Sequence, residues 1–274
     1  MENKTVKVQD ISIGKGHGIA LIAGPCVIES YESAVLAARE IKKIARAASV
    51  PFIFKASFDK ANRSSIDSYR GPGIDKGLEI LKAVRDEVKV PVLSDVHDII
   101  QVKKAAKVLD VLQIPAFLSR QTDLLVEAAR TGKPVNVKKG QFMSPEEMRN
   151  VVSKMESQGA SDIMLTERGT FFGYNMLVND FRSIIVMGQT GYPVVFDATH
   201  SVQRPAGKGT MSGGDPVFIL PLAKAAVALG ADVLFLEVHM EPEKALSDAS
   251  SMLRMDLLGD LLAEIKKIEK AVRI

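Results

Sequence analysis

The segment KASFDKANRSS, residues 55–65, gathers two lysines, an arginine, an aspartate, an asparagine and three serines within eleven positions. It follows a short apolar run at 51–54 that is typical of a buried strand, and no apolar period continues through it. Cations and hydroxyl groups that directly follow a strand suit a phosphorylated ligand. A solvated basic loop is the ordinary alternative, and the surrounding chain decides between the two.

The composition excludes several classes of function. The chain has 274 residues, of which 46% are hydrophobic and 25% charged, with a net charge of +3, as in ordinary globular proteins. No run of five or six basic residues supports binding to nucleic acid or to a membrane surface. Without an apolar leader or a long apolar span, we expect a cytoplasmic protein. The single cysteine excludes an internal disulfide.

Short apolar runs alternate with amphipathic segments along the chain, which predicts repeated strand–helix units. Several of the runs open with proline, which a strand tolerates at its first residue. The predicted strands are 19–23, 51–54, 91–94, 108–114, 134–137, 162–165, 193–196 and 232–236. The predicted helices are 31–48, 74–87, 98–107, 121–131, 145–158, 176–188, 215–229 and 255–271.

Eight such units in about 270 residues predict an α/β fold, a (β/α)8 TIM barrel. An open doubly wound sheet is the competing architecture, but eight consecutive units favour closure. Residues 4–13 alternate and end at Gly14, so a short β-hairpin is expected in an N-terminal extension, residues 1–18. No linker interrupts the chain, and we expect one domain over 1–274. In such a barrel the active site lies at the carboxyl ends of the strands.

Four residues near these strand ends have the chemistry of metal ligands. Cys26, His200 and Glu237 follow strands one, seven and eight, which are neighbours in a closed barrel, and Asp248 lies beyond strand eight. A thiolate, an imidazole and two carboxylates suit Zn²⁺, Fe²⁺ or Mn²⁺ better than Mg²⁺ or Ca²⁺. A buried cysteine with ordinary polar neighbours is the alternative interpretation, and the spacing does not choose among the metals.

Cations gather at the same predicted mouth of the barrel. Folding does not need them there, and they would repel each other unless anions lie among them. Two phosphate groups, or a phosphate and a carboxylate, would balance the charge. The cations are Lys55, Lys60, Arg63, Arg120, Lys138 and Arg168.

The sequence closely resembles the 3-deoxy-D-manno-octulosonate 8-phosphate synthases, from about residue 19 to residue 248. KASFDKANRSS is the most specific match, because the related 3-deoxy-D-arabino-heptulosonate 7-phosphate synthases typically have a KPRTS-type segment there. The other matching motifs are AGPCVIES (23–30), YRGPG (69–73), QIPAFLSRQTDL (113–124), NVKKGQF (136–142), TERG (166–169), FDATHSVQ (196–203), SGG (212–214) and KALSDAS (244–250).

The resemblance implies a condensation of phosphoenolpyruvate with D-arabinose 5-phosphate in lipopolysaccharide (Kdo) biosynthesis. It implies that Asn62, Arg63 and Ser64 face the sugar phosphate. It also implies that Arg120 reaches into a neighbouring subunit of a homotetramer. The residues implied around phosphoenolpyruvate are Lys55, Lys60, Gln113, Lys138 and Arg168, with the backbone of Ala116 nearby.

Members of this family divide at the position of Cys26: those with cysteine resemble the metal-dependent class, and those with asparagine work without metal. The resemblance thus implies a metal held by Cys26, His200, Glu237 and Asp248, which positions the reactants and activates water.

The proton-transfer steps stay open at this level. Lys60, Lys138, His97 or metal-bound water are the candidates, and Asp95 completes the predicted catalytic set at the end of strand three.

Three alternatives and two departures accompany this interpretation. The alternatives are a heptulosonate 7-phosphate synthase that uses erythrose 4-phosphate, a Schiff-base aldolase that uses Lys138 or Lys55, and a non-catalytic binding protein. Asp67 stands where the family often has histidine, and Met240 stands where proline is common.

Overall fold

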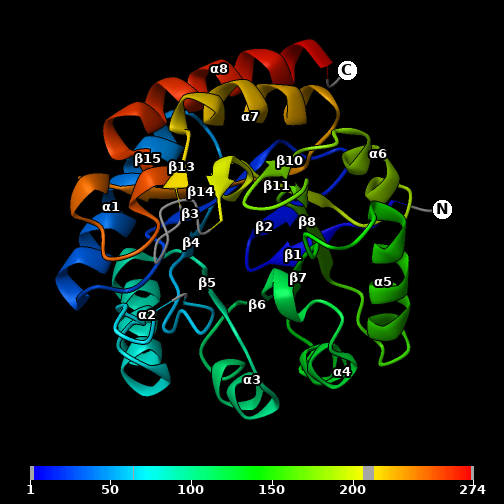
Figure 1. Cartoon of the computed structure of the whole chain (residues 1–274), viewed down its shortest axis with the longest axis horizontal. Helices are drawn as coiled ribbons and strands as arrows, with labels where there is room; N and C mark the ends of the chain where they lie inside the picture. The colour runs from blue at the N-terminus through cyan, green and yellow to red at the C-terminus, as the bar shows by residue number, and fades with distance from the viewer. Residues whose placement is uncertain (1–2, 64, 206–212, 273–274) are drawn as a thin grey trace.

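The computed structural model describes residues 3–63, 65–205 and 213–272, and within them a closed parallel barrel (Figure 1). Neighbouring strands pair in chain order, and the first and last close the ring, with Leu234 opposite Leu21. The barrel strands are β3 (Ala20–Gly24), β4 (Phe52–Lys55), β5 (Val92–Asp95), β6 (Val111–Ile114), β7 (Val135–Lys138), β8 (Ile163–Glu167), β11 (Val194–Asp197) and β14 (Val233–His239). The predicted (β/α)8 fold is therefore confirmed.

An outer ring of helices covers the barrel (Figure 1). These helices bury one apolar face, as their sequence period predicts; in α1 the buried residues include Ala34, Ala38 and Ile41. They are α1 (Tyr31–Ala47), α2 (Ile74–Val88), α3 (Ile99–Ala105), α4 (Thr122–Arg130), α5 (Met148–Glu156), α6 (Arg182–Gly188), α7 (Ile219–Ala228) and α8 (Leu258–Val272).

The predicted N-terminal hairpin is confirmed. Strands β1 (Val6–Val8) and β2 (Ile11–Ile13) pair antiparallel, with Val6 opposite Ile13. Their apolar side chains form one core cluster with residues inside the barrel, among them Ile22 and Phe235. The hairpin therefore closes the end of the barrel opposite the carboxyl ends of the strands. Organisation of the whole chain 1–274 as one domain stays a prediction.

The predicted helix over 176–188 is wrong in its first half. Leu177–Val178 forms strand β10, which pairs antiparallel with β9 (Thr170–Phe171), and only the later residues form α6. The apolar run at 176–178 fits either period, and the turn at Gly173, with φ 70°, favours a hairpin. Three other predicted helices begin with a 3₁₀ turn: η2 (Pro145–Glu147), η4 (Pro216–Phe218) and η7 (Met255–Leu257).

Short strands and turns build the rim above the barrel. Strand β12 (Gln203–Arg204) pairs with β13 (Gly213–Gly214). The 3₁₀ turn η6 (Ala249–Ser251) leads into β15 (Leu253–Arg254), which extends the sheet beside β14. These pairings hold the long connections after β11 and β14 over the mouth of the barrel, where the candidate ligands lie.

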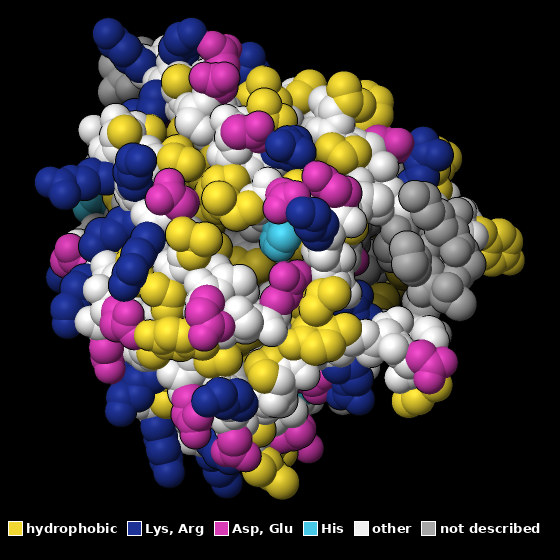
Figure 2. Space-filling view, turned by 90° about the vertical axis from the view of Figure 1, so that its left-hand side faces the viewer, with side chains coloured by type: hydrophobic (Ala, Val, Ile, Leu, Met, Phe, Trp, Pro, Cys, Tyr) yellow, Lys and Arg dark blue, Asp and Glu magenta, His cyan; other side chains and the backbone are white. Residues whose placement is uncertain are grey.

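On the face drawn in Figure 2, cationic side chains are most frequent along the left-hand edge, and acidic and apolar side chains lie among them. A nucleic-acid interface would instead gather cations on one face. Among the described residues, every helix is too short or too polar to span a membrane.

Candidate active site and metal centre

Three side chains from distant parts of the sequence meet at the carboxyl end of the barrel. Ligand atoms of Cys26, Glu237 and Asp248 all lie within 4.8 Å of one another. The thiol of Cys26 lies 2.9 Å from Asp248 Oδ2 and 2.8 Å from Ser247 Oγ. A thiolate with two carboxylates is a donor set for a transition metal rather than for Mg²⁺ or Ca²⁺.

Local backbone geometry fixes two of these ligands. A Cβ atom on Gly24 would lie 2.0 Å from the carbonyl oxygen of Lys55, so only glycine allows β3 to approach β4 this closely just before Cys26. Asp248 adopts left-handed backbone geometry with φ 49°, which aspartate tolerates better than most residues. Strain of this kind is common where a side chain must point at a ligand.

His200, the fourth predicted ligand, lies beside this group, on the turn η3 (His200–Val202). Its Nδ1 atom lies 2.7 Å from Asp197 Oδ2, and its Nε2 atom lies 3.6 Å from Glu237 Oε1. A carboxylate on one ring nitrogen leaves the other free to bind a metal. His200 is not part of the tight three-residue group, so its metal role stays a prediction.

Two observations bear on whether a metal fits here. The Oε2 atom of Glu237 is buried and has no partner among the described residues, as expected of a carboxylate oxygen kept for an ion. Burial and the charges of Asp248 and Glu237 raise the pKa of the Cys26 thiol well above its usual value. A bound cation reverses that balance, because a coordinating thiol loses its proton.

The lysines of the predicted cation cluster are paired with protein carboxylates. Lys55 Nζ donates to Glu237 Oε1 at 3.1 Å, and Lys60 Nζ lies 4.0 Å from Asp248 Oδ2. Lys138 donates to Asp197. The expectation that only bound anions would balance these cations therefore needs correction. Carboxylates also lie at the carboxyl ends of the strands, and closure of the barrel brings these negative charges next to the lysines.

Lys60 and Lys138 differ in proton affinity. Burial alone would lower the pKa of Lys60, but the charges of the candidate metal ligands outweigh it and raise that pKa. Burial lowers the pKa of Lys138 in spite of the attraction of Asp197. Lys60 is therefore suited to hold a positive charge against an anion. Lys138 is the better suited of the two to release a proton.

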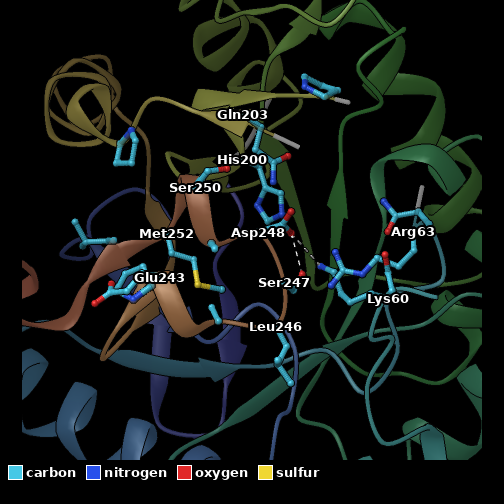
Figure 3. Close-up of a pocket in the computed structure, with 18 of the residues that line it drawn as sticks. Lys60, Arg63, His200, Gln203, Glu243, Leu246, Ser247, Asp248, Ser250 and Met252 are labelled. Carbon is cyan, nitrogen blue, oxygen red and sulfur yellow. Dashed lines mark hydrogen bonds and ion pairs between the residues drawn. The ribbon is translucent and has the colours of Figure 1, made fainter. Parts of the chain in front are cut away.

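A cavity of about 1050 Å³ opens above these groups, and Figure 3 shows part of its lining. His200 and Asp248 lie side by side in it, with Lys60 and Arg63 close by (Figure 3). Asn62 also lines the cavity. A space of this size accommodates two small phosphorylated molecules.

Two arginines of the cavity keep unpaired N–H groups. Nη2 of Arg63 and Nη1 of Arg168 are buried without a hydrogen-bond partner among the described residues. Their other groups are held, since Arg63 donates to the carbonyl of Tyr69 at 3.1 Å and Arg168 donates to Gln203 Oε1 at 3.2 Å. Oriented, unpaired guanidinium N–H groups in a cavity are suited to phosphate or carboxylate.

A chain of hydrogen bonds crosses four strands inside the barrel. Thr166 donates to Asn136 at 2.6 Å, and Asn136 donates to Gln113 at 2.8 Å. Gln113 in turn donates to Asp95 at 2.7 Å, and Ser57 donates to the second oxygen of Asp95. The chain orients Gln113 and Asp95. The residue type of Asn136 did not mark it as functional, although the motif NVKKGQF contains it.

The remaining predicted residues occupy different places. His97 lies edge-on to the ring of Phe58, with Nδ1 2.9 Å from Gln101 Oε1, and is not among the described residues that line the cavity. Ala116 begins the turn η1 (Ala116–Leu118) after β6. Arg120 points outward, with 64% of its side chain exposed, 3.7 Å from Glu147. Ser64 falls outside the described residues.

Asp197 is the main participant that the sequence analysis did not select. It contacts both Lys138 and His200, and the Thr199 hydroxyl donates to it at 3.1 Å. Burial would raise the pKa of Asp197, but the charges of His200 and Lys138 hold it well below its usual value. Its position three residues before His200 in FDATHSVQ was the available signal.

Asp95 should make the protein lose stability in acid. Burial would raise its pKa, but the charges of Lys55 and Lys60 hold it below its usual value. The unfolded chain therefore binds this proton first, and the free energy of unfolding should fall as the pH drops below about 4. Urea unfolding between about pH 6 and about pH 3 measures the slope. Asp95→Asn should make the slope shallower, and an unchanged slope would contradict this assignment.

Comparisons with known proteins show the family of the chain. The family model of the DAHP synthetase I family matches residues 2–273. A protein of Syntrophotalea carbinolica named 2-dehydro-3-deoxyphosphooctonate aldolase is 53% identical over 269 residues, covering 98% of this chain and 97% of its own. Proteins of the same name from Geotalea daltonii and Pelobacter propionicus are 53% and 54% identical over 270 residues, each covering 98% of this chain and 99% of its own. The chain therefore belongs to the DAHP synthetase I family, in the group named 2-dehydro-3-deoxyphosphooctonate aldolase.

Proposed function

We propose that the protein condenses phosphoenolpyruvate with D-arabinose 5-phosphate and water to give 3-deoxy-D-manno-octulosonate 8-phosphate and phosphate. The observation that carries the proposal is one cavity lined by His200, Asp248 and two arginines, Arg63 and Arg168, that each keep an unpaired N–H group. Two anions and an electrophilic aldehyde need such a combination. Relatives over nearly the full length carry the corresponding name, which supports the octulosonate over the heptulosonate 7-phosphate.

The two substrates are assigned to different parts of the site. Lys60 and Arg168, with the deeper Lys55 and Lys138, supply positive charge for the phosphate and carboxylate of phosphoenolpyruvate, next to Gln113 and the Ala116 backbone. Asn62 and Arg63, which line the cavity, face arabinose 5-phosphate together with Ser64. Holding both anions side by side turns a bimolecular encounter into a positioned one, which is a large part of such catalysis.

The chemistry joins C3 of phosphoenolpyruvate to the aldehyde carbon of the sugar phosphate. Water adds to C2, and the resulting tetrahedral centre loses phosphate by cleavage of the C–O bond, which leaves the 2-keto acid. Arg168 and Lys60 stabilise the negative charge on the phosphate that departs. Lys138, with its lowered pKa and its contact to Asp197, is suited to move a proton at Nζ. His97 and Asp95 stay in the predicted catalytic set.

We infer that the cofactor is one divalent transition metal, Zn²⁺, Fe²⁺ or Mn²⁺. The unpaired Oε2 of Glu237 and the close group of Cys26, Glu237 and Asp248 support it, with His200 as the fourth ligand. When bound, such an ion supplies Lewis-acid polarisation and lowers the pKa of water. Asp197 orients the His200 ring for it through Nδ1.

We further propose a cytoplasmic homotetramer in which Arg120 binds the sugar phosphate of a neighbouring subunit. The exposed side chain of Arg120, on the turn that follows the cavity residue Phe117, supports this arrangement. Sedimentation of the purified protein measures the assembly.

A comparison of aldose phosphates tests the function. Phosphate release from phosphoenolpyruvate should proceed with arabinose 5-phosphate, with kcat/KM at least about 100-fold above that for erythrose 4-phosphate, because the site discriminates by hydroxyl contacts. Preference for erythrose 4-phosphate would favour the heptulosonate 7-phosphate synthase. Inactivation by borohydride with a keto substrate would favour the Schiff-base aldolase. Binding of phosphoenolpyruvate without phosphate release would favour a non-catalytic protein.

A further inference from the structure

Gln141 is a cavity residue to which the proposed function gives no role. It lies in the connection between β7 and η2 and lines the same cavity as Arg63, Arg168 and His200. Its exposed fraction is only 4%, and its carbonyl atom Oε1 is buried with no hydrogen-bond partner among the described residues. A buried acceptor without a partner is costly unless a ligand or water supplies a donor.

The backbone around Gln141 is held in place. The N–H of Phe171, on β9, donates to the carbonyl of Gln141 at 2.9 Å. The buried Lys139 donates to the carbonyl of Met143 at 3.2 Å and to the hydroxyl of Thr170 at 2.9 Å. Lys139 also lies 3.6 Å from Glu167, so β8 takes part in the same support. The side chain that carries the unpaired Oε1 atom therefore belongs to a segment held by hydrogen bonds rather than to a free loop.

The polarity of the unpaired atoms separates Gln141 from the two arginines of the cavity. Arg63 and Arg168 offer N–H donors, which match phosphate and carboxylate oxygens. Gln141 keeps an unpaired acceptor beside its amide N–H groups, and this acceptor matches an O–H donor. Ionised phosphoenolpyruvate has no hydroxyl group to donate, whereas an aldose phosphate has several. The acceptor of Gln141 is therefore complementary to the sugar rather than to phosphoenolpyruvate.

We propose that Gln141 is a specificity-determining residue whose side-chain carbonyl accepts a hydrogen bond from a hydroxyl group of the aldose phosphate. The inference rests on the proposed function, because it assigns one contact to a substrate of that reaction. A site built to pair with a hydroxyl group discriminates strongly against an analogue that lacks it.

The variant Gln141→Leu tests the contact, because leucine keeps most of the volume and removes the acceptor. We expect kcat/KM for arabinose 5-phosphate to fall about 10-fold, while KM for phosphoenolpyruvate changes less than about 3-fold. The matched control is Gln158→Leu, the same change at a side chain that pairs with Arg130 and does not line the cavity. It should leave both constants unchanged. An equal loss for both substrates would overturn the proposal.

Deoxy analogues of arabinose 5-phosphate, each without one hydroxyl group, separate a direct contact from a general disturbance. For the analogue that lacks the hydroxyl bound by Gln141, kcat/KM should be about 10-fold lower than for arabinose 5-phosphate with the parent protein. With Gln141→Leu the same analogue should show no further decrease in kcat/KM, since the two deletions remove one interaction. If removal of each hydroxyl group lowers kcat/KM by the same factor in the variant as in the parent protein, Gln141 pairs with water only and the proposal is overturned.

Failure of this inference differs from failure of the proposed function. If the parent protein releases no phosphate with arabinose 5-phosphate, the proposed function fails. Calorimetric titration with arabinose 5-phosphate then decides on Gln141. A Kd that is about 10-fold weaker in Gln141→Leu than in the parent and Gln158→Leu proteins supports the contact. Equal dissociation constants, or no binding to any of the three, overturn it.

Discussion

Replacing Cys26 by alanine should remove the bound metal and lower kcat/KM by more than about 100-fold. Loss of partners that only orient the ligands typically costs about 10–100-fold, and loss of a ligand should cost more. Cys26 is buried against Asp248 and Ser247, so no exposed group replaces its sulfur. Metal analysis of the purified protein and phosphate-release kinetics measure the two effects.

The matched control for this change is Ser247→Ala. It removes the hydroxyl 2.8 Å from the Cys26 sulfur but no ligand, so the metal should stay and activity should fall less than in Cys26→Ala.

Cys26→Asn should keep part of the activity in the presence of a chelator, as expected if the two classes of the family are interconvertible here. Full activity of Cys26→Ala after demetallation would sink the metal assignment.

Replacing Lys138 by methionine should lower the free energy of unfolding by about 3–5 kcal/mol, because it leaves the carboxylate of Asp197 buried without its lysine. Both side chains are nearly inaccessible to solvent, with exposed fractions of 6% and 0%. The double variant Lys138→Met/Asp197→Asn should recover about half of the loss or more, since no unpaired buried charge remains. Urea unfolding at neutral pH measures all three proteins.

Lys224→Met is the comparison for this pair, because Lys224 pairs with Glu264 in a partly exposed position. Solvent screens such a pair, so its loss should lower the free energy of unfolding far less. If Lys138→Met and Lys224→Met destabilised the protein equally, the buried pair would have no special role. A double variant less stable than Lys138→Met alone would also speak against the pairing.

Much of the fold follows from local pattern. Each strand–helix unit carries its own apolar period, so the barrel could be predicted without long-range information. The strand limits differ by one or more residues, as at β4 and β11, because the last residue of a strand is often the polar one that the pattern excludes. Closure of the barrel then placed Glu237, on β14, beside the end of β3 that leads to Cys26, as Glu237 opposite Gly24 shows.

The pairing of charges did not follow from pattern. Lys138 and Asp197 are 59 positions apart and both end a strand, so the sequence alone does not reveal that they meet. The acceptor of Gln141 was hidden for a similar reason, since a glutamine in a loop is usually solvated. Which polar atoms lack partners depends on packing around the whole barrel. The hairpin forms because strands β9 and β10 pair with each other, and the apolar period of the sequence does not indicate that pairing.

In the proposed reaction, this cavity joins phosphoenolpyruvate to arabinose 5-phosphate with attack of water at C2. The most direct test uses phosphoenolpyruvate labelled with heavy oxygen at the atom that bridges C2 and phosphorus. Mass spectrometry after reaction with arabinose 5-phosphate should find the label in the released phosphate and solvent oxygen at C2 of an eight-carbon keto acid phosphate. Label retained in the keto acid, or phosphate released without that product, would contradict the proposed reaction.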